Sequence, residues 1–186
     1  FNVHTNGMVY KDDLVDKLSN FKSANIGFSI DGIGEKNDYI RYGSKWKDIL
    51  DNLKKYMDDC KKYNNVSIGV RATITPWNIY HYEENHDYFK KLGINATGVW
   101  CDDKPWNDVR YLPNKIKDAV IEKLSLYDND EESWSILFDD IKKWLRTTPD
   151  DHEQLQHSFM EFNNKIDQVR KEKFSSTFPE YSKLFV

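Results

Sequence analysis

Polar side chains stand at the ends of successive strand-like segments of this sequence. They offer amide, hydroxyl, carboxylate, thiol and guanidinium groups, at Asn6, Ser29, Asp31, Arg71, Thr73, Thr75, Cys101, Asp102 and Asp103. In parallel α/β proteins, ligands bind beyond the carboxyl ends of the strands. We therefore expect these groups to form a polar rim that suits a zwitterionic small molecule.

The third of these segments carries its polar residues on one face. Alternate strand residues point to the same side, so Arg71, Thr73 and Thr75 share a face. An arginine inside a strand is costly to bury unless it is paired, and Asp31 at the end of the preceding strand is its candidate partner. A structural interpretation stays open beside the functional one, because Asn-Gly and Asp-Gly are common turn dipeptides and a Ser or Thr at a strand end often only caps a helix.

Strands and helices that alternate along the chain must position these groups. The strands are predicted at 1–5, 25–30, 66–74 and 94–100. The helices are predicted from apolar residues at helical spacing, at 12–22, 46–63, 80–92 and 113–127, with 33–44 as a loop and Ser44 as an N-cap. This alternation indicates βαβ units and a parallel sheet.

The expected fold class is therefore α/β: a partial (β/α) barrel with parallel strands, its helices on one outer side. This barrel is predicted over residues 1–127. An acidic segment, 128–132, then leads into a C-terminal helical extension over 128–186, with helices at 134–145 and 152–173. The aromatic tail 174–186 is expected to dock on the body of the protein.

Composition excludes several classes of protein. The chain has 186 residues, of which 15% are aromatic, and such rings argue against disorder because they bury large apolar areas. The net charge of −4 gives no strong field for nucleic acid. No apolar run approaches the roughly 18 residues of a membrane helix.

The cysteines and histidines predict no metal site. Cys60 falls on the apolar stripe of a predicted helix and is expected to be a buried thiol, whereas Cys101 faces either a site or the core. Two thiols make no disulfide framework, so a reducing, cytoplasmic location is expected. The five histidines include no pair at the i, i+4 spacing that zinc sites on helices use.

Three motifs in the first half of the chain resemble the radical S-adenosylmethionine (radical SAM) enzymes. They are TNG at 5–7, SIDG at 29–32 and NDYIRYGSKWKDILDNL at 37–53, and the TITPWN segment at 73–78 fits the same pattern. Together they look like the third to sixth strands of that family's partial (β/α) barrel. The tail FSSTFPEYSKLF resembles phage-associated members with a twitch-type C-terminal region.

The resemblance implies a cofactor and a chemistry. In this family a [4Fe–4S] cluster binds SAM and cleaves it to a 5′-deoxyadenosyl radical, which abstracts hydrogen from the substrate. It implies that Ser29 and Arg41 lie near the ribose or carboxylate of SAM and that Asn6 and Gly7 line the same pocket. Thr73 and Thr75 would lie on the adenosyl or substrate side.

The chain also departs from the family. The CxxxCxxC loop and the GGEP-like motif are both absent, and Cys60 and Cys101 are too far apart to replace the loop, because a cluster needs three close thiolates. We therefore expect the C-terminal two thirds of a radical SAM protein, inactive without an N-terminal barrel segment or a complementing chain. With no cysteine-rich segment after the barrel, no auxiliary cluster is expected.

Other functions stay open. One alternative is a non-catalytic α/β module that binds a small molecule or a protein; a hydrolase or nucleotide-binding protein is disfavoured because GxSxG, GxGxxG and GxxxxGK[ST] do not occur. The substrate is open among peptides, nucleotides, carbohydrates and other small molecules. Trp100, Trp106 and Arg110 either contact it or belong to a solvated loop with buried tryptophans.

Overall fold

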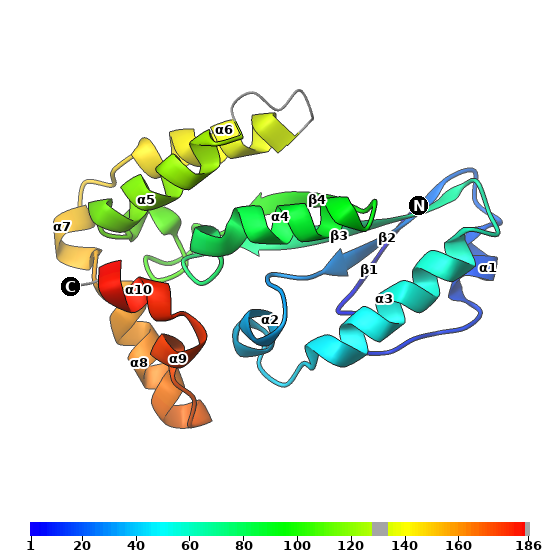
Figure 1. Cartoon of the computed structure of the whole chain (residues 1–186), viewed down its shortest axis with the longest axis horizontal. Helices are drawn as coiled ribbons and strands as arrows, with labels where there is room; N and C mark the ends of the chain where they lie inside the picture. Colours follow the sequence, from blue (N-terminus) through cyan, green and yellow to red (C-terminus); the bar gives the residue numbers. More distant parts are fainter. Residues whose placement is uncertain (128–133, 185–186) are drawn as a thin grey trace. The chain divides into compact units, whose positions relative to one another are not determined.

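The structure, a computed structural model, describes residues 1–127 and 134–184 (Figure 1). The chain divides into two compact units. Unit 1 comprises residues 1–73 and 84–99, and unit 2 comprises residues 74–83 and 100–186. The acidic segment predicted at 128–132 lies outside the described residues, and the ranges 1–127 and 128–186 remain a prediction about domain organisation.

Unit 1 contains the sheet and its helices. In chain order these are β1 (Asn2–Thr5), α1 (Leu14–Leu18), β2 (Ala24–Ser29), α2 (Glu35–Ile40), α3 (Trp46–Cys60), β3 (Val66–Ile74), α4 (Tyr82–Lys91) and β4 (Asn95–Trp100). The last residue of β3, the last of β4 and the first two of α4 belong to unit 2. All four predicted strands are present, and both ends of β3 match the prediction.

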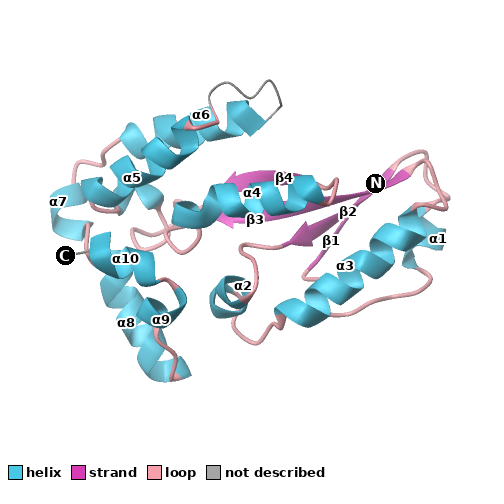
Figure 2. Ribbon diagram, in the orientation of Figure 1, coloured by secondary structure: helices cyan, strands magenta, loops and turns pink. Residues whose placement is uncertain are grey.

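The four strands form one sheet in the order β1-β2-β3-β4. The pairs β1–β2 and β2–β3 are parallel, with Thr5 opposite Phe28 and Ser29 opposite Arg71. The arrows of β3 and β4 point the same way in Figure 2, and α4 joins them as a crossover helix. The predicted α/β fold with a parallel partial barrel is confirmed.

One face of the sheet carries the hydrophobic core of unit 1. Alternate strand residues such as Ile26, Phe28 and Val70 are buried there. Against them pack buried residues of three helices: Val15 and Leu18 of α1, Ile49, Leu53 and Tyr56 of α3, and Phe89 of α4. The helices therefore cover one side of the sheet, as the right-handed crossovers predict.

Two predictions between β1 and α3 were wrong. The helix predicted at 12–22 is shorter, because α1 ends at Leu18; Phe21 is exposed beyond it and stacks on Phe1 with ring centroids 4.5 Å apart. The predicted loop at 33–44 contains α2. Its sequence, EKNDYI, is too short to show a helical repeat of apolar residues.

The predicted N-cap of α3 is also corrected. Ser44 does not cap the helix; the N-cap position falls on Lys45, whose side chain makes no capping bond. Asp38 of α2 does so instead, because its carboxylate accepts the Trp46 backbone N–H at 2.6 Å. Ser44 Oγ lies 3.4 Å from the same carboxylate. A side chain from the preceding helix thus satisfies one of the free N–H groups at the start of α3.

Unit 2 is built from helices. They are η1 (Ile79–His81), η2 (Val109–Tyr111), α5 (Asn114–Ser125), α6 (Trp134–Arg146), α7 (His152–Leu155), α8 (Ser158–Arg170), α9 (Phe174–Thr177) and α10 (Pro179–Leu184). The single helix predicted at 152–173 is therefore two. His152 of α7 is buried and its Nε2 lies 3.1 Å from the Leu112 carbonyl oxygen, while Phe159 of α8 packs on Trp77, so the bend lets the two helices reach different neighbours.

The aromatic residues of the tail pack within unit 2. Phe174, Phe178 and Tyr181 are buried at 2%, 0% and 0% exposure. The Tyr181 hydroxyl donates to the Pro76 carbonyl oxygen at 2.5 Å and accepts the Tyr80 backbone N–H at 3.3 Å. These two bonds hold α10 to the segment 76–80.

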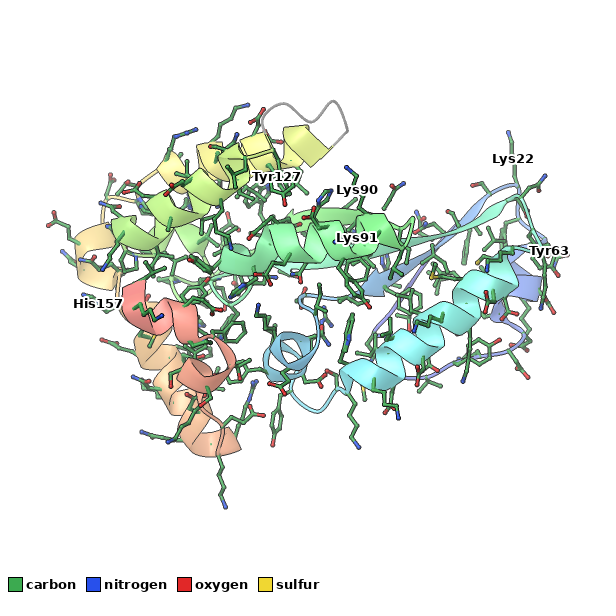
Figure 3. All side chains as sticks on the ribbon, viewed as in Figure 1. Lys22, Tyr63, Lys90, Lys91, Tyr127 and His157 are labelled. Atoms are coloured by element: carbon green, nitrogen blue, oxygen red, sulfur yellow. The ribbon has the colours of Figure 1, made fainter. Side chains whose placement is uncertain are left out.

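The helix α4 ends with charged residues that face solvent. Lys90 and Lys91 close α4, and both are exposed (Figure 3). Within residues 1–127 and 134–184, every helix is too short or too polar to cross a membrane.

The capping of α3 can be tested with Asp38→Ala. This change removes the acceptor of the Trp46 N–H and should lower the free energy of unfolding by about 1 kcal/mol, the usual effect of losing an N-cap. Asp38→Asn keeps an acceptor oxygen and should recover most of that loss in urea unfolding followed by circular dichroism. Equal losses for the two variants would contradict the capping role.

The docking of the tail can be tested with Tyr181→Phe. The buried Pro76 carbonyl and Tyr80 N–H would each lose a partner, so the free energy of unfolding should fall by about 1–3 kcal/mol. Tyr111→Phe is a matched control, because its hydroxyl donates to Asp151 at an exposed position, 2.7 Å away. That control should change stability by less than about 0.5 kcal/mol, and equal losses would rule out the assigned role of Tyr181.

Candidate functional site

A buried carboxylate organises the carboxyl end of β2. Asp31 is 7% exposed, and each of its two carboxylate oxygens has a partner. Oδ1 accepts the Thr73 backbone N–H of β3 at 2.7 Å, and Oδ2 lies 2.8 Å from Nε of Arg41. One side chain thus connects the loop after β2 with the neighbouring strand and with the residue that follows α2.

Two asparagines fix the backbone around Asp31. The Asp31 N–H donates to Oδ1 of Asn37 at 3.4 Å, and Nδ2 of Asn85 donates to the Asp31 carbonyl oxygen at 3.3 Å. Asn37 is fully buried in α2, and Asn85 is buried in α4. The loop is therefore held by hydrogen bonds to α2, α4 and β3, beside the buried side chain of Ile30.

Burial dominates the protonation of this carboxyl group. Removal from water raises the pKa of Asp31, while Arg41 and the Thr73 N–H act in the opposite direction by stabilising the carboxylate. Arg41 compensates the negative charge of Asp31 only in part. The ion pair therefore holds Asp31 in place, but the removal of its charge from water costs free energy.

Arg71 does not pair with Asp31, which corrects the sequence prediction. Its register partner in β2 is Ser29, two residues before Asp31, so the two side chains start from different levels of the sheet. Arg41 occupies the position beside Asp31 instead. Arg71 is exposed, and among the described residues it has no ion-pair partner.

The Asn6-Gly7 turn ends β1 through local hydrogen bonds. The Gly7 N–H donates to Oγ1 of Thr5 at 3.0 Å, and the Met8 N–H donates to Oδ1 of Asn6 at 3.1 Å. Gly7 has φ +75°, and a Cβ there would meet Ile49 and Phe28 at 3.0 Å, so only glycine fits without strain. The Asn6 side chain is therefore already used in the turn, although it remains exposed.

The remaining predicted site residues fall into different units. Ser29 and Thr73 are half-buried in unit 1, near Asp31 and Arg41. Thr75 is buried in unit 2, where its backbone N–H donates to Oδ1 of Asn78 at 2.9 Å. Unit 1 thus brings together Asp31, Arg41 and Thr73, with Ser29 on the adjoining strand end.

A polar pocket on the open face of the sheet was missed by the sequence analysis. It has a volume of about 290 Å³. The residues that line it come from all four strands, and they are Asn2, His4, Asn25, Gly27, Ser67, Ile68, Gly69, Val70, Arg71, Asn95 and Thr97. The signal was present in the alternation of polar residues and glycine along the predicted strands, on the side opposite the core.

Neither cysteine belongs to a metal-binding cluster in the described part of the chain. No three His, Cys, Asp or Glu side chains gather there as ligands. Cys60 is half-buried against the core of unit 1, and burial raises the pKa of its thiol. The Cys101 thiol donates to Asp103 at 3.4 Å, and its pKa is raised by burial and by that carboxylate.

The tryptophans and the arginine after β4 have partners inside unit 2. Trp106 stacks on Phe162 with ring centroids 5.0 Å apart. Arg110 pairs with the buried Asp108 and lies 4.2 Å from the ring centroid of Trp144. These contacts favour the structural interpretation of this loop.

The comparisons with known proteins bear on the fold. No family model matches the sequence, and no curated protein matches it either. The fold is similar to that of native anSMEcpe with bound AdoMet. With the peptide Cp18Cys the TM-score is 0.50 at 16% identity, and with Kp18Cys it is 0.50 at 18% identity. Each match covers 72% of this chain and 38% of the other, so this chain spans less than half the length of those proteins.

Asp31 makes the stability of unit 1 depend on pH. Because burial raises its pKa, the folded chain holds this proton more tightly than the unfolded chain does. The stability that Asp31 contributes is present in acid and is lost as the pH rises from the ordinary aspartate value through the raised pKa. Urea unfolding over a series of pH values gives the free energy of unfolding of wild type and of Asp31→Asn. The wild-type value minus the variant value should fall as the pH rises across that window, and a difference that grows with pH would contradict the assignment.

Proposed function

We propose that this chain is the C-terminal part of a radical SAM enzyme and that unit 1 contributes to its AdoMet site. The observation that carries the proposal is the position of the motif residues. Ser29 ends β2, and Arg41 is held beside that strand end by the buried Asp31. Ligands of parallel α/β folds bind at this end of the strands. The solved structures with a similar fold contain AdoMet, the cofactor that the sequence resemblance implies.

The residues at this strand end fit the polar end of AdoMet. Asp31 is the one ion-pair partner of Arg41 among the described residues, and the contact uses Nε, so the guanidinium still offers donors to a carboxylate. The half-buried hydroxyl of Ser29 suits a ribose hydroxyl. Asn6 and Thr73 would add further polar groups to this AdoMet site. Thr75 and Arg71 are included among the proposed AdoMet-binding residues on the sequence pattern alone.

The residues of this chain do not fit a [4Fe–4S] cluster. Cys60 lies in unit 1 and Cys101 in unit 2, and three close thiolates are required. A separate N-terminal barrel segment or a complementing chain would hold the cluster, which together with AdoMet supplies the radical that abstracts hydrogen from the substrate. This chain's own part is to bind and orient AdoMet and to exclude water from it.

The edge of the sheet suits such a partner. β1 pairs with β2 and stands at one end of the strand order, so within the described residues no strand pairs with its other side, and the proposed segment would add a parallel strand there. The rest of the proposal rests on the sequence alone. It comprises a peptide or small molecule as the substrate, a twitch-type C-terminal region, a phage association and a cytoplasmic location.

A second candidate is a non-catalytic module that binds a small molecule. It is favoured by the polar pocket, which unit 1 forms entirely from its own four strands. Such a module would bind its ligand with no added segment and would show no dependence on AdoMet.

AdoMet binding tests the proposed site. Equilibrium dialysis of the full chain with labelled AdoMet should show binding, and Arg41→Gln should weaken it about tenfold or more through the loss of charge-assisted hydrogen bonds. Arg41→Lys keeps the charge but loses the planar fork, so it should recover only part of the affinity. Arg146→Gln, an exposed arginine of unit 2, is the matched control. The proposal fails if AdoMet does not bind or if Arg41→Gln binds it as wild type does while folded.

Anaerobic reconstitution with iron and sulfide tests the missing cluster ligands. The chain alone should show no stable cluster absorbance, because its two cysteines cannot supply three thiolates. Cys60→Ser and Cys101→Ser should leave the spectrum unchanged. A stable [4Fe–4S] cluster on this chain alone would overturn the need for a second segment.

A further inference from the structure

The polar pocket of unit 1 has a floor made of two facing glycines. Gly27 of β2 and Gly69 of β3 are register partners, so the sheet carries no side chain at these adjacent positions. Both glycines line the pocket. The depression in the sheet therefore results from a pair of missing side chains, and the residues around it form the walls.

The two glycines differ in what surrounds them. A Cβ on Gly27 would meet Nδ1 of His4 at 2.8 Å, so the imidazole of β1 already lies against this part of the floor. A Cβ on Gly69 would lie 3.4 Å from the Asn95 carbonyl oxygen, an ordinary contact distance. The Asn25 amide would lie 3.6 Å from the same Cβ, so a methyl group at Gly69 fits at contact distance beneath this side chain.

The charge of the pocket is positive. Arg71 is exposed at its wall, and none of the described residues that line the pocket is Asp or Glu. His4 adds an imidazole to the same lining. An exposed guanidinium that has no ion-pair partner among the described residues is complementary to an anion, and its planar fork matches a carboxylate or a phosphate.

The remaining polar residues supply directed hydrogen bonds. Nδ2 of Asn25 donates to Oγ of Ser67 at 3.0 Å, which fixes the amide across the β2–β3 pair and leaves its oxygen as an acceptor. Asn2 and Asn95 line the same pocket. Amides offer both donors and acceptors, so the walls suit a ligand with hydroxyl or amide groups beside its charge.

We propose that this pocket binds a small organic anion, through Arg71 at its carboxylate or phosphate and through the asparagines at its polar groups. The volume of about 290 Å³ is near the lower end of small-molecule sites and suits a compact ligand rather than a folded partner. The paired glycines leave room on the sheet for the His4 imidazole and the Asn25 amide, which face the ligand from the pocket lining. This inference deepens the second candidate of the proposed function, and it stands apart from the AdoMet site because the pocket residues need no AdoMet and do not include Arg41.

Calorimetric titration of the full chain tests the proposal. The probes are glutarate, glycerol 3-phosphate and uncharged glycerol. At least one of the two anions should bind and glycerol should not, and the preferred anion shows whether the ligand's charge is a carboxylate or a phosphate. Arg71→Gln should weaken anion binding about tenfold to hundredfold, the usual effect of losing hydrogen bonds to a charged group.

Gly69→Ala is the second variant, because it acts through space rather than charge. The added methyl occupies the pocket floor at an ordinary contact distance and should weaken anion binding. Its unfolding free energy should be equal to or higher than that of wild type, because alanine loses less conformational freedom than glycine on folding. Amide NMR shifts on adding the anion should be largest at Gly27 and Gly69.

Lys91→Gln is the matched control. It removes one positive charge from the end of α4, where Lys91 is exposed (Figure 3). Lys91 is not among the residues that line the pocket. It should leave anion binding unchanged. Failure of both anions to bind, or binding that survives both Arg71→Gln and Gly69→Ala, overturns the proposal. The AdoMet experiment uses Arg41, which does not line this pocket, so the two proposals can fail separately.

Discussion

The period-two alternation of β2 and β3 is the constraint on which unit 1 depends. Parallel sheets are usually covered on both faces and read as continuous apolar runs. Here one face carries Ile26, Phe28 and Val70 against the helices, while the positions between them carry Asn25, Gly27 and Arg71. A shift of register by one residue would exchange the two faces completely, so the core and the pocket are specified by the same pattern.

Asp31 transmits this order from the sheet to the loop beyond it. Its carboxylate accepts the backbone N–H of Thr73, next to the end of the β2–β3 ladder. The same carboxylate pairs with Arg41, the residue that follows α2. The loop contains Gly32 and Gly34, which provide little packing of their own. Buried polar contacts replace that packing, and they place a guanidinium at a defined position beside the strand end.

Much of unit 1 could be predicted from the sequence, because its strands have strong local patterns. The segment Val66–Ile74 is bounded by Asn65 and by Thr75-Pro76, and both ends of β3 were predicted correctly. The helix α2 was missed since it is one and a half turns long and has only Tyr39 and Ile40 as large apolar residues.

Pairings across the fold were harder to predict than elements. The expected contact of Arg71 with Asp31 ignored the register, which places Arg71 opposite Ser29. Arg41 reaches Asp31 because the chain turns back through α2. This turn depends on tertiary contacts, such as the hydrogen bond of Asn37 with the Asp31 backbone. The pocket needed the same information, because only the register shows that Gly27 and Gly69 are neighbours.

The segment 74–83 gives the chain an interleaved connectivity. It belongs to unit 2 although residues of unit 1 precede and follow it, so the backbone passes from one unit to the other three times. No single cut in the gene separates the units. A chain that stopped at residue 99 would keep Tyr80 and Pro76 but lose Tyr181, their hydrogen-bond partner. A truncation between residues 83 and 100 therefore removes most of unit 2 and leaves its segment 74–83 without the rest of that unit.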